Sequence, residues 1–196
     1  MAKLYFKYGA MGSSKTANAL ITKFNYEERG MKVWLIKPSV DTRDGVSAVR
    51  SRIGLCANAQ VITPDMDIYA EYTASHADCH VIITDECQFF QPAQIDQLRK
   101  IVDELNIPVL CYGLRTDFLT HLFPGSRRLF EVADSITEIK TICGCGKKAI
   151  VNARIDWQGN VITEGGQIML GGNDAYLAMC HSCWRNKIDE QNKEEK

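Results

Sequence analysis

Residues 9–16 read Gly-Ala-Met-Gly-Ser-Ser-Lys-Thr, and this stretch decides the fold. The apolar run 4–8 leads into it, and a helix-like run, 17–29, follows it. A strand, a turn of small residues ending in Lys-Thr and then a helix is the order of a phosphate-binding loop, or P-loop. The sequence therefore predicts a P-loop here, although an ordinary strand-turn-helix junction has the same outline.

The residue types of this loop suit a bound phosphate group. Glycines permit tight backbone geometry, so that successive N–H groups point inward, and the free N–H groups of the following helix add to the attraction. Lys15 is expected to reach the outer phosphates, and the Thr16 hydroxyl to ligate Mg²⁺. Ser14 stands where the usual pattern has a glycine. The predicted phosphate-binding residues are Gly9, Ala10, Met11, Gly12, Ser13, Ser14, Lys15 and Thr16.

Length and composition suit one large globular domain, or one domain with a small appendage. The chain has 196 residues, of which 45% are hydrophobic, and this is enough for a sizeable core. A formal net charge of −1 gives no reason to expect a nucleic-acid partner. The first residues lack the apolar stretch of a secretion signal, and no window reaches the roughly 18 apolar residues of a membrane span. We therefore expect a cytoplasmic enzyme without nucleic-acid or membrane partners.

Apolar runs and helix-like segments alternate through the first part of the chain. Strand-like runs lie at 32–37, 80–84 and 108–112, and residues 93–106 carry apolar side chains at helical spacing. This alternation predicts the α/β class over residues 1–142, with a parallel sheet of the P-loop NTPase type flanked by helices. Weaker signals place a short strand at 61–62, a helix at 67–75 and a closing strand within 136–142.

The composition changes at Cys143. Residues 143–188 are rich in glycine and cysteine and are too few to form a stable hydrophobic core of their own. This segment therefore needs a cross-link, such as a bound metal ion or disulfides. We predict a small metal-binding lobe here. Residues 189–196 are charged and lack apolar anchors, which predicts a disordered tail.

Four cysteines form two close pairs at the ends of this lobe. Cys143-x-Cys145 is separated by 34 residues from Cys180-x-x-Cys183. Two close pairs of thiolates suit tetrahedral Zn²⁺ with no open position, which predicts a structural rather than a catalytic ion. Disulfides are the alternative, which a cytosolic compartment disfavours, and His181 is an alternative ligand with worse spacing. The other four cysteines are predicted to be reduced and buried: Cys56, Cys79, Cys87 and Cys111.

Two acidic residues follow the buried strand signal at 81–84. In a parallel sheet the carboxyl end of this strand faces the same crevice as the P-loop, which lies about 70 residues upstream. Asp85 is expected to hold Mg²⁺, directly or through water. Glu86 is expected to act as a general base or to orient an acceptor hydroxyl. The alternative is a strand followed by a solvated acidic turn.

Asp41-Thr42-Arg43 follows the second strand signal, again at the carboxyl side of the sheet. Arg43 is a candidate to steady the charge on a transferred phosphoryl group. Considered alone, the motif favours an ordinary surface arginine.

Further motifs extend the pattern over nearly the whole chain, from about Lys3 to Lys187. In this order and at this length, the set resembles the type II, zinc-containing thymidine kinases of bacteria. The motifs are the P-loop, Asp41-Thr42-Arg43, Asp85-Glu86-Cys87-Gln88-Phe89-Phe90, Tyr112-Gly113-Leu114-Arg115-Thr116-Asp117-Phe118, Gly171-Gly172-Asn173-Asp174-Ala175-Tyr176 and the cysteine pairs.

The resemblance implies transfer of the γ-phosphate of ATP to the 5′-hydroxyl of thymidine, giving dTMP. It implies Mg²⁺ bound with ATP, structural Zn²⁺, a homotetramer and feedback inhibition by dTTP. Glu86 matches the proton acceptor, and Arg43 and Lys15 match residues near the transferred phosphate. The residues linked to Mg²⁺ are Thr16, Asp85 and Asp41.

The resemblance also implies a nucleoside pocket covered by a lid between the cysteine pairs, roughly residues 152–172, that binds largely through backbone groups. The sequence departs from the family pattern at Ser14, at Arg115, where many members have aspartate, and in the short first cysteine pair. The implied nucleoside-binding residues are Met11, Gln88, Phe89, Leu114, Phe118, Ile168, Gly171 and Tyr176.

Two other functions are compatible with parts of the sequence. A P-loop NTPase acting as a switch or motor would use the cysteine lobe to dock a partner, but it has no need of an aromatic acceptor pocket. A zinc-ribbon nucleic-acid binder would share the cysteines, but the near-neutral charge argues against it.

Overall fold

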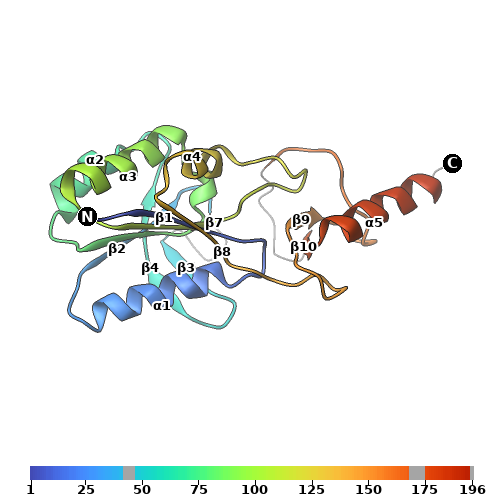
Figure 1. Ribbon diagram of the computed structural model, residues 1–196, viewed down its shortest axis with the longest axis horizontal. Helices are drawn as coiled ribbons and strands as arrows, with labels where there is room; N and C mark the ends of the chain where they lie inside the picture. The colour runs from blue at the N-terminus through green and yellow to red at the C-terminus, as the bar shows by residue number, and fades with distance from the viewer. Residues whose placement is uncertain (42–46, 168–174, 195–196) are drawn as a thin grey trace.

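The computed structural model describes residues 1–41, 47–167 and 175–194, and its centre is a parallel sheet of six strands (Figure 1). The strand order is β5-β2-β6-β7-β1-β8, and each neighbouring pair runs parallel. The predicted α/β class is therefore confirmed. The strands are β1 (Leu4–Tyr8), β2 (Val33–Pro38), β5 (Gln60–Ile62), β6 (Val81–Thr84), β7 (Val109–Gly113) and β8 (Ser135–Glu138).

Helices cover both faces of the sheet, which buries its central strands on both sides. One face carries α1 (Lys15–Glu27), and the other carries α3 (Pro92–Leu105) and α4 (Pro124–Val132) (Figure 1). Strands buried on both faces are nearly continuous apolar runs, which is why β6 and β7 stand out in the sequence. Two shorter helical elements join the second layer: α2 (Ile68–Glu71) with a π-helical turn (Tyr72–His76), and a 3₁₀ turn (Cys87–Phe89).

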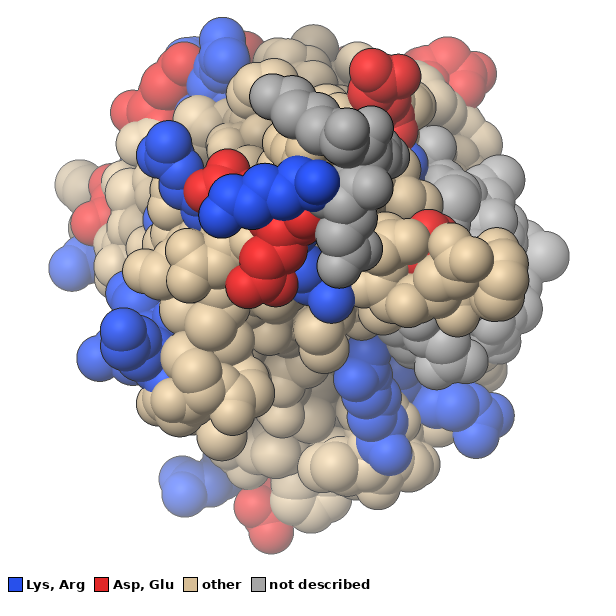
Figure 2. All heavy atoms as spheres, turned by 90° about the vertical axis from the view of Figure 1, so that its right-hand side faces the viewer, with Lys and Arg blue, Asp and Glu red and all other residues tan. Residues whose placement is uncertain are grey.

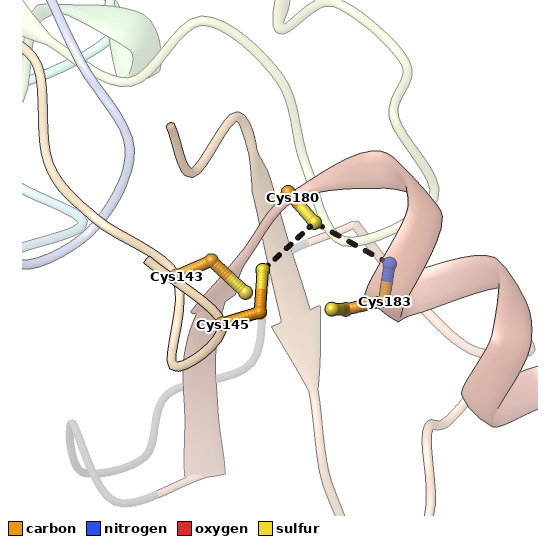
Figure 3. A group of neighbouring side chains, drawn as sticks. All are labelled: Cys143, Cys145, Cys180 and Cys183. Carbon is orange, nitrogen blue, oxygen red and sulfur yellow. Dashed lines mark hydrogen bonds between the residues drawn. The ribbon is translucent and has the colours of Figure 1, made fainter. Parts of the chain in front are cut away.

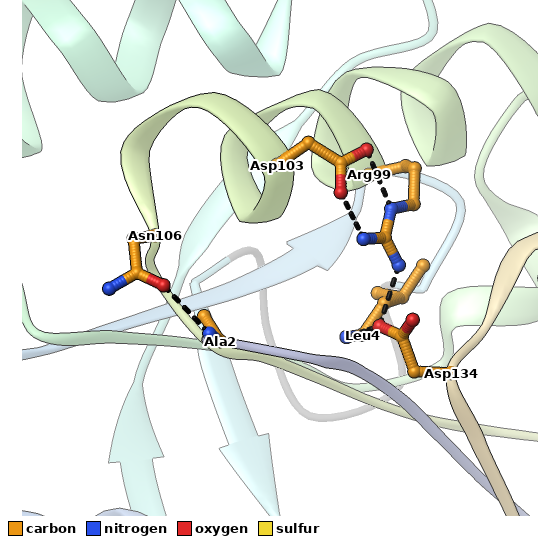
Figure 4. Close-up of polar contacts among 6 residues, drawn as sticks. All are labelled: Ala2, Leu4, Arg99, Asp103, Asn106 and Asp134. Carbon is orange, nitrogen blue, oxygen red and sulfur yellow. Dashed lines mark hydrogen bonds and ion pairs between the residues drawn. The ribbon is translucent and has the colours of Figure 1, made fainter.

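The start of β1 is fixed to helix α3 by polar contacts (Figure 4). The Asp134 carboxylate accepts a hydrogen bond from the Leu4 N–H at 2.7 Å. It also forms an ion pair with Arg99 at 2.6 Å. Arg99 also pairs with Asp103 on its own helix. The strand that leads into the P-loop is thus tied down at its beginning, so the loop starts from a fixed point.

A short β-hairpin lies beside α1 and is absent from the sequence prediction. It consists of β3 (Ala48–Arg50) and β4 (Cys56–Asn58), paired antiparallel. The prediction that Cys56 is buried is wrong, because this hairpin leaves the side chain exposed, whereas Cys79, Cys87 and Cys111 are buried as predicted.

The C-terminal lobe is built on a separate two-stranded sheet. β9 (Val151–Arg154) pairs antiparallel with β10 (Tyr176–Met179), and α5 (His181–Glu194) follows. The small core of the lobe contains Cys143, Ala149, Ala153, Met179 and Cys180.

The prediction of a disordered tail over 189–196 is wrong for its described part, because α5 continues to Glu194. Gln191 gives the physical reason. Its side-chain oxygen accepts the Val161 N–H at 2.8 Å, and its side-chain nitrogen donates to the Val161 carbonyl at 3.2 Å. This polar anchor replaces the apolar anchors that the tail lacks. Among the described residues, no helix is long and apolar enough to cross a membrane.

Candidate active site

The P-loop joins β1 to α1, as the sequence predicts. Gly9 has no room for a side chain, since an added Cβ would lie 2.3 Å from the Ile139 carbonyl oxygen. Ser14 has φ 61° and ψ 28°, which is the left-handed region that favours glycine. The serine therefore takes the backbone conformation for which the usual pattern has glycine, at a cost of about 1 kcal/mol.

A cleft of about 400 Å³ opens beside this loop. It is lined by the P-loop, by the first turn of α1 and by residues 49–54 of the hairpin. The strand ends contribute Asp41, Asp85, Glu86 and Leu114. Every one of these segments lies at the carboxyl edge of the parallel sheet or beside it, which is where open α/β sheets bind ligands.

Lys15 lies folded against its own loop. Its ammonium group donates to the Ala10 carbonyl at 2.8 Å and lies 3.3 Å from the Ser13 hydroxyl. The side chain is buried, so its charge is held at the floor of the cleft. This is the position from which a lysine reaches the outer phosphates of a nucleotide.

Thr16 and Asp85 meet across the cleft although 69 positions separate them. The Thr16 hydroxyl donates to an Asp85 carboxylate oxygen at 2.9 Å. Burial, together with the neighbouring Glu86 charge, raises the pKa of Asp85 to about 7, and the Thr16 hydrogen bond opposes this. A hydroxyl and a carboxylate are hard oxygen donors, so this pair suits Mg²⁺.

Asp41 lies three residues after the end of β2 and is paired with a lysine that the sequence analysis missed. Lys37 is completely buried, and its ammonium group lies 3.5 Å from an Asp41 oxygen and donates to the Ala48 carbonyl at 2.9 Å. The signal in the sequence is a lysine inside an apolar strand. Arg43, the third residue of that motif, falls outside the described residues.

Glu86 lines the cleft and has an unusual, left-handed backbone conformation with φ 51°. The Gln88 side-chain nitrogen donates to a Glu86 carboxylate oxygen at 2.5 Å, and the Gln88 oxygen accepts the Leu114 N–H at 2.9 Å. Gln88 is 1% exposed, so in this structure its amide orients Glu86 and ties it to the end of β7.

The residues implied for the nucleoside pocket do not all lie in one place. Met11 and Leu114 line the cleft with Glu86. Phe118 is buried and Tyr176 half-buried, and both contact Arg154 of β9: the guanidinium lies 3.7 Å from the Phe118 ring centre, and it donates to the Tyr176 hydroxyl. Phe89 packs edge-on against Phe123, with the ring centres 5.4 Å apart. Ile168 and Gly171 lie outside the described residues.

Cys143, Cys145, Cys180 and Cys183 converge on one point (Figure 3), with their sulfur atoms all within 4.8 Å of one another. The Cys145 and Cys180 sulfurs are 3.7 Å apart. A tetrahedral ion with metal–sulfur bonds of about 2.3 Å places sulfurs about 3.8 Å apart, so the set fits Zn²⁺. The other predicted candidate, His181, packs against Trp184 instead, with the ring centres 5.5 Å apart.

Backbone N–H groups favour the thiolate form at two of these cysteines, whereas hydrogen bonds from the neighbouring thiols raise the pKa of Cys183 to about 12. The backbone N–H groups of Cys145 and Cys180 lower the pKa of Cys143 to about 6. The Cys183 N–H lies 3.4 Å from the Cys180 sulfur and lowers the pKa of that thiol. Thiolates are the form in which cysteines bind a metal.

Comparison with known proteins places this site in a family. The family model described as thymidine kinase matches residues 2–184. The chain belongs to the thymidine kinase family. It is 47% identical to the thymidine kinase of Enterobacteria phage T4 over 94% of this chain and 96% of that protein.

Bacterial thymidine kinases are similarly related. The protein of Yersinia pseudotuberculosis is 45% identical over 96% of this chain and 97% of that protein. The protein of Vibrio vulnificus is 46% identical over 96% of this chain and 99% of that protein. The resemblance identified from the motifs is therefore confirmed over nearly the whole chain.

Some residues at the site of this thymidine kinase family member are not identified by motif analysis. Arg50 and Arg52 of the hairpin line the cleft, where positive charge suits phosphates. Asn152 of β9 contacts Met11 of the P-loop, and Arg154 of the same strand contacts the Phe118 ring. Their only signal in the sequence is two polar residues alternating with Val151 and Ala153 in a short strand.

Proposed function

We propose that this protein transfers the γ-phosphate of ATP to the 5′-hydroxyl of thymidine, giving dTMP and ADP. The observation that carries the proposal is the hydrogen bond from Thr16 to Asp85, because it brings the phosphate loop and the acid pair to one cleft. Glu86, the next residue, faces the same cleft beside Met11 and Leu114. A phosphate cradle, an acceptor base and an apolar wall are what a nucleoside kinase requires.

The P-loop binds the phosphates of ATP through backbone N–H groups and the ammonium group of Lys15. Thr16, Asp85 and Asp41 supply oxygen atoms for Mg²⁺. When bound, this ion neutralises charge on the phosphate oxygens. Arg43 supports the transferred group in the same way. Since phosphoryl transfer depends mainly on positioning and charge neutralisation, these contacts account for most of the catalysis.

Glu86 accepts the proton of the 5′-hydroxyl as the hydroxyl oxygen bonds to the γ-phosphorus and the bond from that phosphorus to the leaving ADP oxygen breaks. Gln88 keeps one Glu86 oxygen occupied at 2.5 Å, which fixes the direction of the carboxylate. An oriented base needs less rearrangement in the transition state.

Thymine binds between apolar and aromatic side chains, which suit a flat pyrimidine. Met11, Phe89, Leu114, Phe118 and Tyr176 form the walls. Ile168 and Gly171 belong to the lid over the base, and Gln88 contributes through the orientation of Leu114.

The four cysteines hold structural Zn²⁺. The fit of sulfur spacing to a tetrahedral ion supports this, as does the stabilisation of thiolates by backbone N–H groups. Reduced, metal-binding cysteines are typical of the cytoplasm, where we place the protein. Lysine, arginine and acidic side chains are interspersed on the face seen in Figure 2. This distribution and the net charge of −1 support small-molecule substrates rather than nucleic acid.

We also propose a homotetramer that is inhibited by dTTP. Ile21 and Phe24 on α1 are exposed, and they offer apolar surface to another copy of the chain. Light scattering during gel filtration measures the oligomeric state, and steady-state assays with added dTTP measure the inhibition.

The proposed reaction is tested by ADP release from ATP and Mg²⁺ with and without thymidine. We expect release to depend on thymidine and to yield dTMP in equal amount. ADP release at the same rate with every nucleoside, and without any, would instead indicate a P-loop NTPase switch.

A further inference from the structure

Strand β9 of the C-terminal lobe carries two polar side chains that are almost completely buried. Asn152 is 2% exposed and Arg154 is 3% exposed. Residues two positions apart in a strand share one face, so both side chains point to the same side of β9. Burying an amide and a guanidinium is costly unless both are well hydrogen-bonded, so their partners show what each holds in place.

Asn152 bridges two loops at the carboxyl edge of the main sheet. Its side-chain oxygen accepts the Met11 N–H of the P-loop at 2.7 Å, and its side-chain nitrogen donates to the Thr116 carbonyl at 2.9 Å. Both ends of the amide are used. The Met11 N–H is therefore held by the lobe, and the phosphate cradle is left with the N–H groups further along the loop.

Arg154 contacts several residues around the proposed nucleoside wall. Its guanidinium lies over the Phe118 ring, with 3.7 Å from its central carbon to the ring centre. It donates to the Tyr176 hydroxyl at 2.8 and 3.1 Å. It also donates to the Gly166 carbonyl at 3.1 Å, in the segment between the cysteine pairs. One cation thus fixes an aromatic wall, a tyrosine and the backbone of the lid.

We propose that Asn152 and Arg154 are positioning residues that fix the two substrate sites relative to each other. Asn152 positions the ATP site through the P-loop, and Arg154 positions the thymidine site through its aromatic wall and lid. The proposal rests on the proposed kinase function. It gives the lobe a task beyond covering the nucleoside, because β9 sets the shape of the loop that binds the other substrate.

The two roles predict opposite kinetic effects for variants of matched size. Asn152→Leu frees the Met11 N–H and loosens the loop, so we expect KM for ATP to rise about tenfold, with a smaller rise in KM for thymidine because Met11 also belongs to the proposed thymine wall. Arg154→Met releases the thymidine side, so we expect the reverse pattern. A tenfold change corresponds to about 1.4 kcal/mol, which is within the range for one or two lost buried hydrogen bonds.

Amide hydrogen exchange supplies a readout that does not depend on activity. The Met11 amide is expected to exchange faster in Asn152→Leu and at the wild-type rate in Arg154→Met. Asn152→Asp keeps the oxygen that accepts the Met11 N–H but loses the donor to Thr116, so it is expected to retain most of the protection. Asn192→Leu and Arg127→Met, at exposed positions, make the same chemical changes away from the cleft and are expected to match wild type.

Unchanged exchange at Met11 in Asn152→Leu would overturn the role of Asn152. A parallel rise of both KM values in both variants would show a shared loss of stability and would overturn the division of roles. If Arg154→Met does not fold, Arg154→Lys keeps the charge but loses the planar fork, and it is expected to raise KM for thymidine selectively. A wild-type protein inactive on thymidine would count against the proposed function instead, and the exchange experiment would still test Asn152.

Discussion

The main sheet and the C-terminal lobe are stabilised in different ways. The six-stranded sheet buries continuous apolar strands under helices of 9 to 14 residues, so its stability is spread over many side chains. The lobe has two strands of four residues, a core of a few small side chains, and point contacts made by four sulfurs, Asn152 and Arg154. The sheet therefore provides a rigid edge for the phosphate site, whereas the lobe depends on a few single residues.

Loss of one sulfur gives the largest expected effect. Structural zinc contributes on the order of 10–16 kcal/mol of apparent binding free energy, far more than the lobe core supplies. Cys145→Ala is expected to lose zinc and to expose the amides of β9 and β10 to exchange, while β6 and β7 stay protected. Metal analysis and hydrogen exchange measure the two outcomes. Full zinc content in this variant would show that the ligand set is wrong, and Cys56→Ala is the matched control at an exposed cysteine.

Replacement of Glu86, the proposed base, tests the role that we assign to the main sheet. Glu86→Gln keeps the shape of the side chain but cannot accept the proton, so we expect kcat to fall about 10²- to 10⁴-fold. KM for ATP is expected to stay within about twofold, because the phosphate cradle is untouched. Steady-state kinetics measure both, with Glu190→Gln on the surface of α5 as the control. Turnover near the wild-type value would show that Glu86 is not the proton acceptor.

Asp85 makes the stability of the sheet depend on pH. Its pKa is about 7 in the folded protein and near 3.8 when unfolded, so between these values the folded state holds a proton that the unfolded state has lost. The contribution of Asp85 to the free energy of unfolding therefore falls as pH rises from about 4 to about 7.

Asp85→Asn has no such titration, so without Mg²⁺ it is expected to become more stable than wild type as pH rises through this window. Urea unfolding at several pH values measures the difference. Parallel stability curves for the two proteins would contradict the raised pKa.

Ser14 gives the smallest expected effect. Ser14→Gly relieves the left-handed strain, but glycine gains freedom in the unfolded chain, so we expect a net stabilisation of about 0.5 kcal/mol. For a chain of this size the melting temperature rises by about 1–2 °C. Ser14→Ala keeps the strain and is expected to give no rise. Equal melting temperatures for the glycine and alanine variants would show that the loop stores no strain at this position.

Sequence reasoning worked best where many residues share one pattern. The sequence predicts the apolar runs of β6 and β7, the P-loop and the acid pair after β6. Burial on both faces and phosphate chemistry restrict the residue types at these positions. The clustering of the four cysteines could be predicted for the same reason, since a four-cysteine metal site restricts both residue type and spacing.

Contacts made by single residues could not be predicted from the sequence. Asn152 meets Met11 across 141 positions, and a strand of four residues carries no periodic signal for that meeting. The hairpin strands β3 and β4 have three residues each, too few to show alternation. The helical tail depends on one glutamine, Gln191, and its two hydrogen bonds to Val161.

The most direct measurement offers the protein an equimolar mixture of the four natural deoxynucleosides with ATP carrying a labelled γ-phosphate. The label is expected to appear mainly in dTMP, on the 5′-oxygen, because the cleft joins a phosphate cradle and Glu86 to a wall suited to thymine. Label found only in inorganic phosphate, or spread equally over all four nucleoside monophosphates, would contradict a thymidine kinase site built by the sheet and the lobe together.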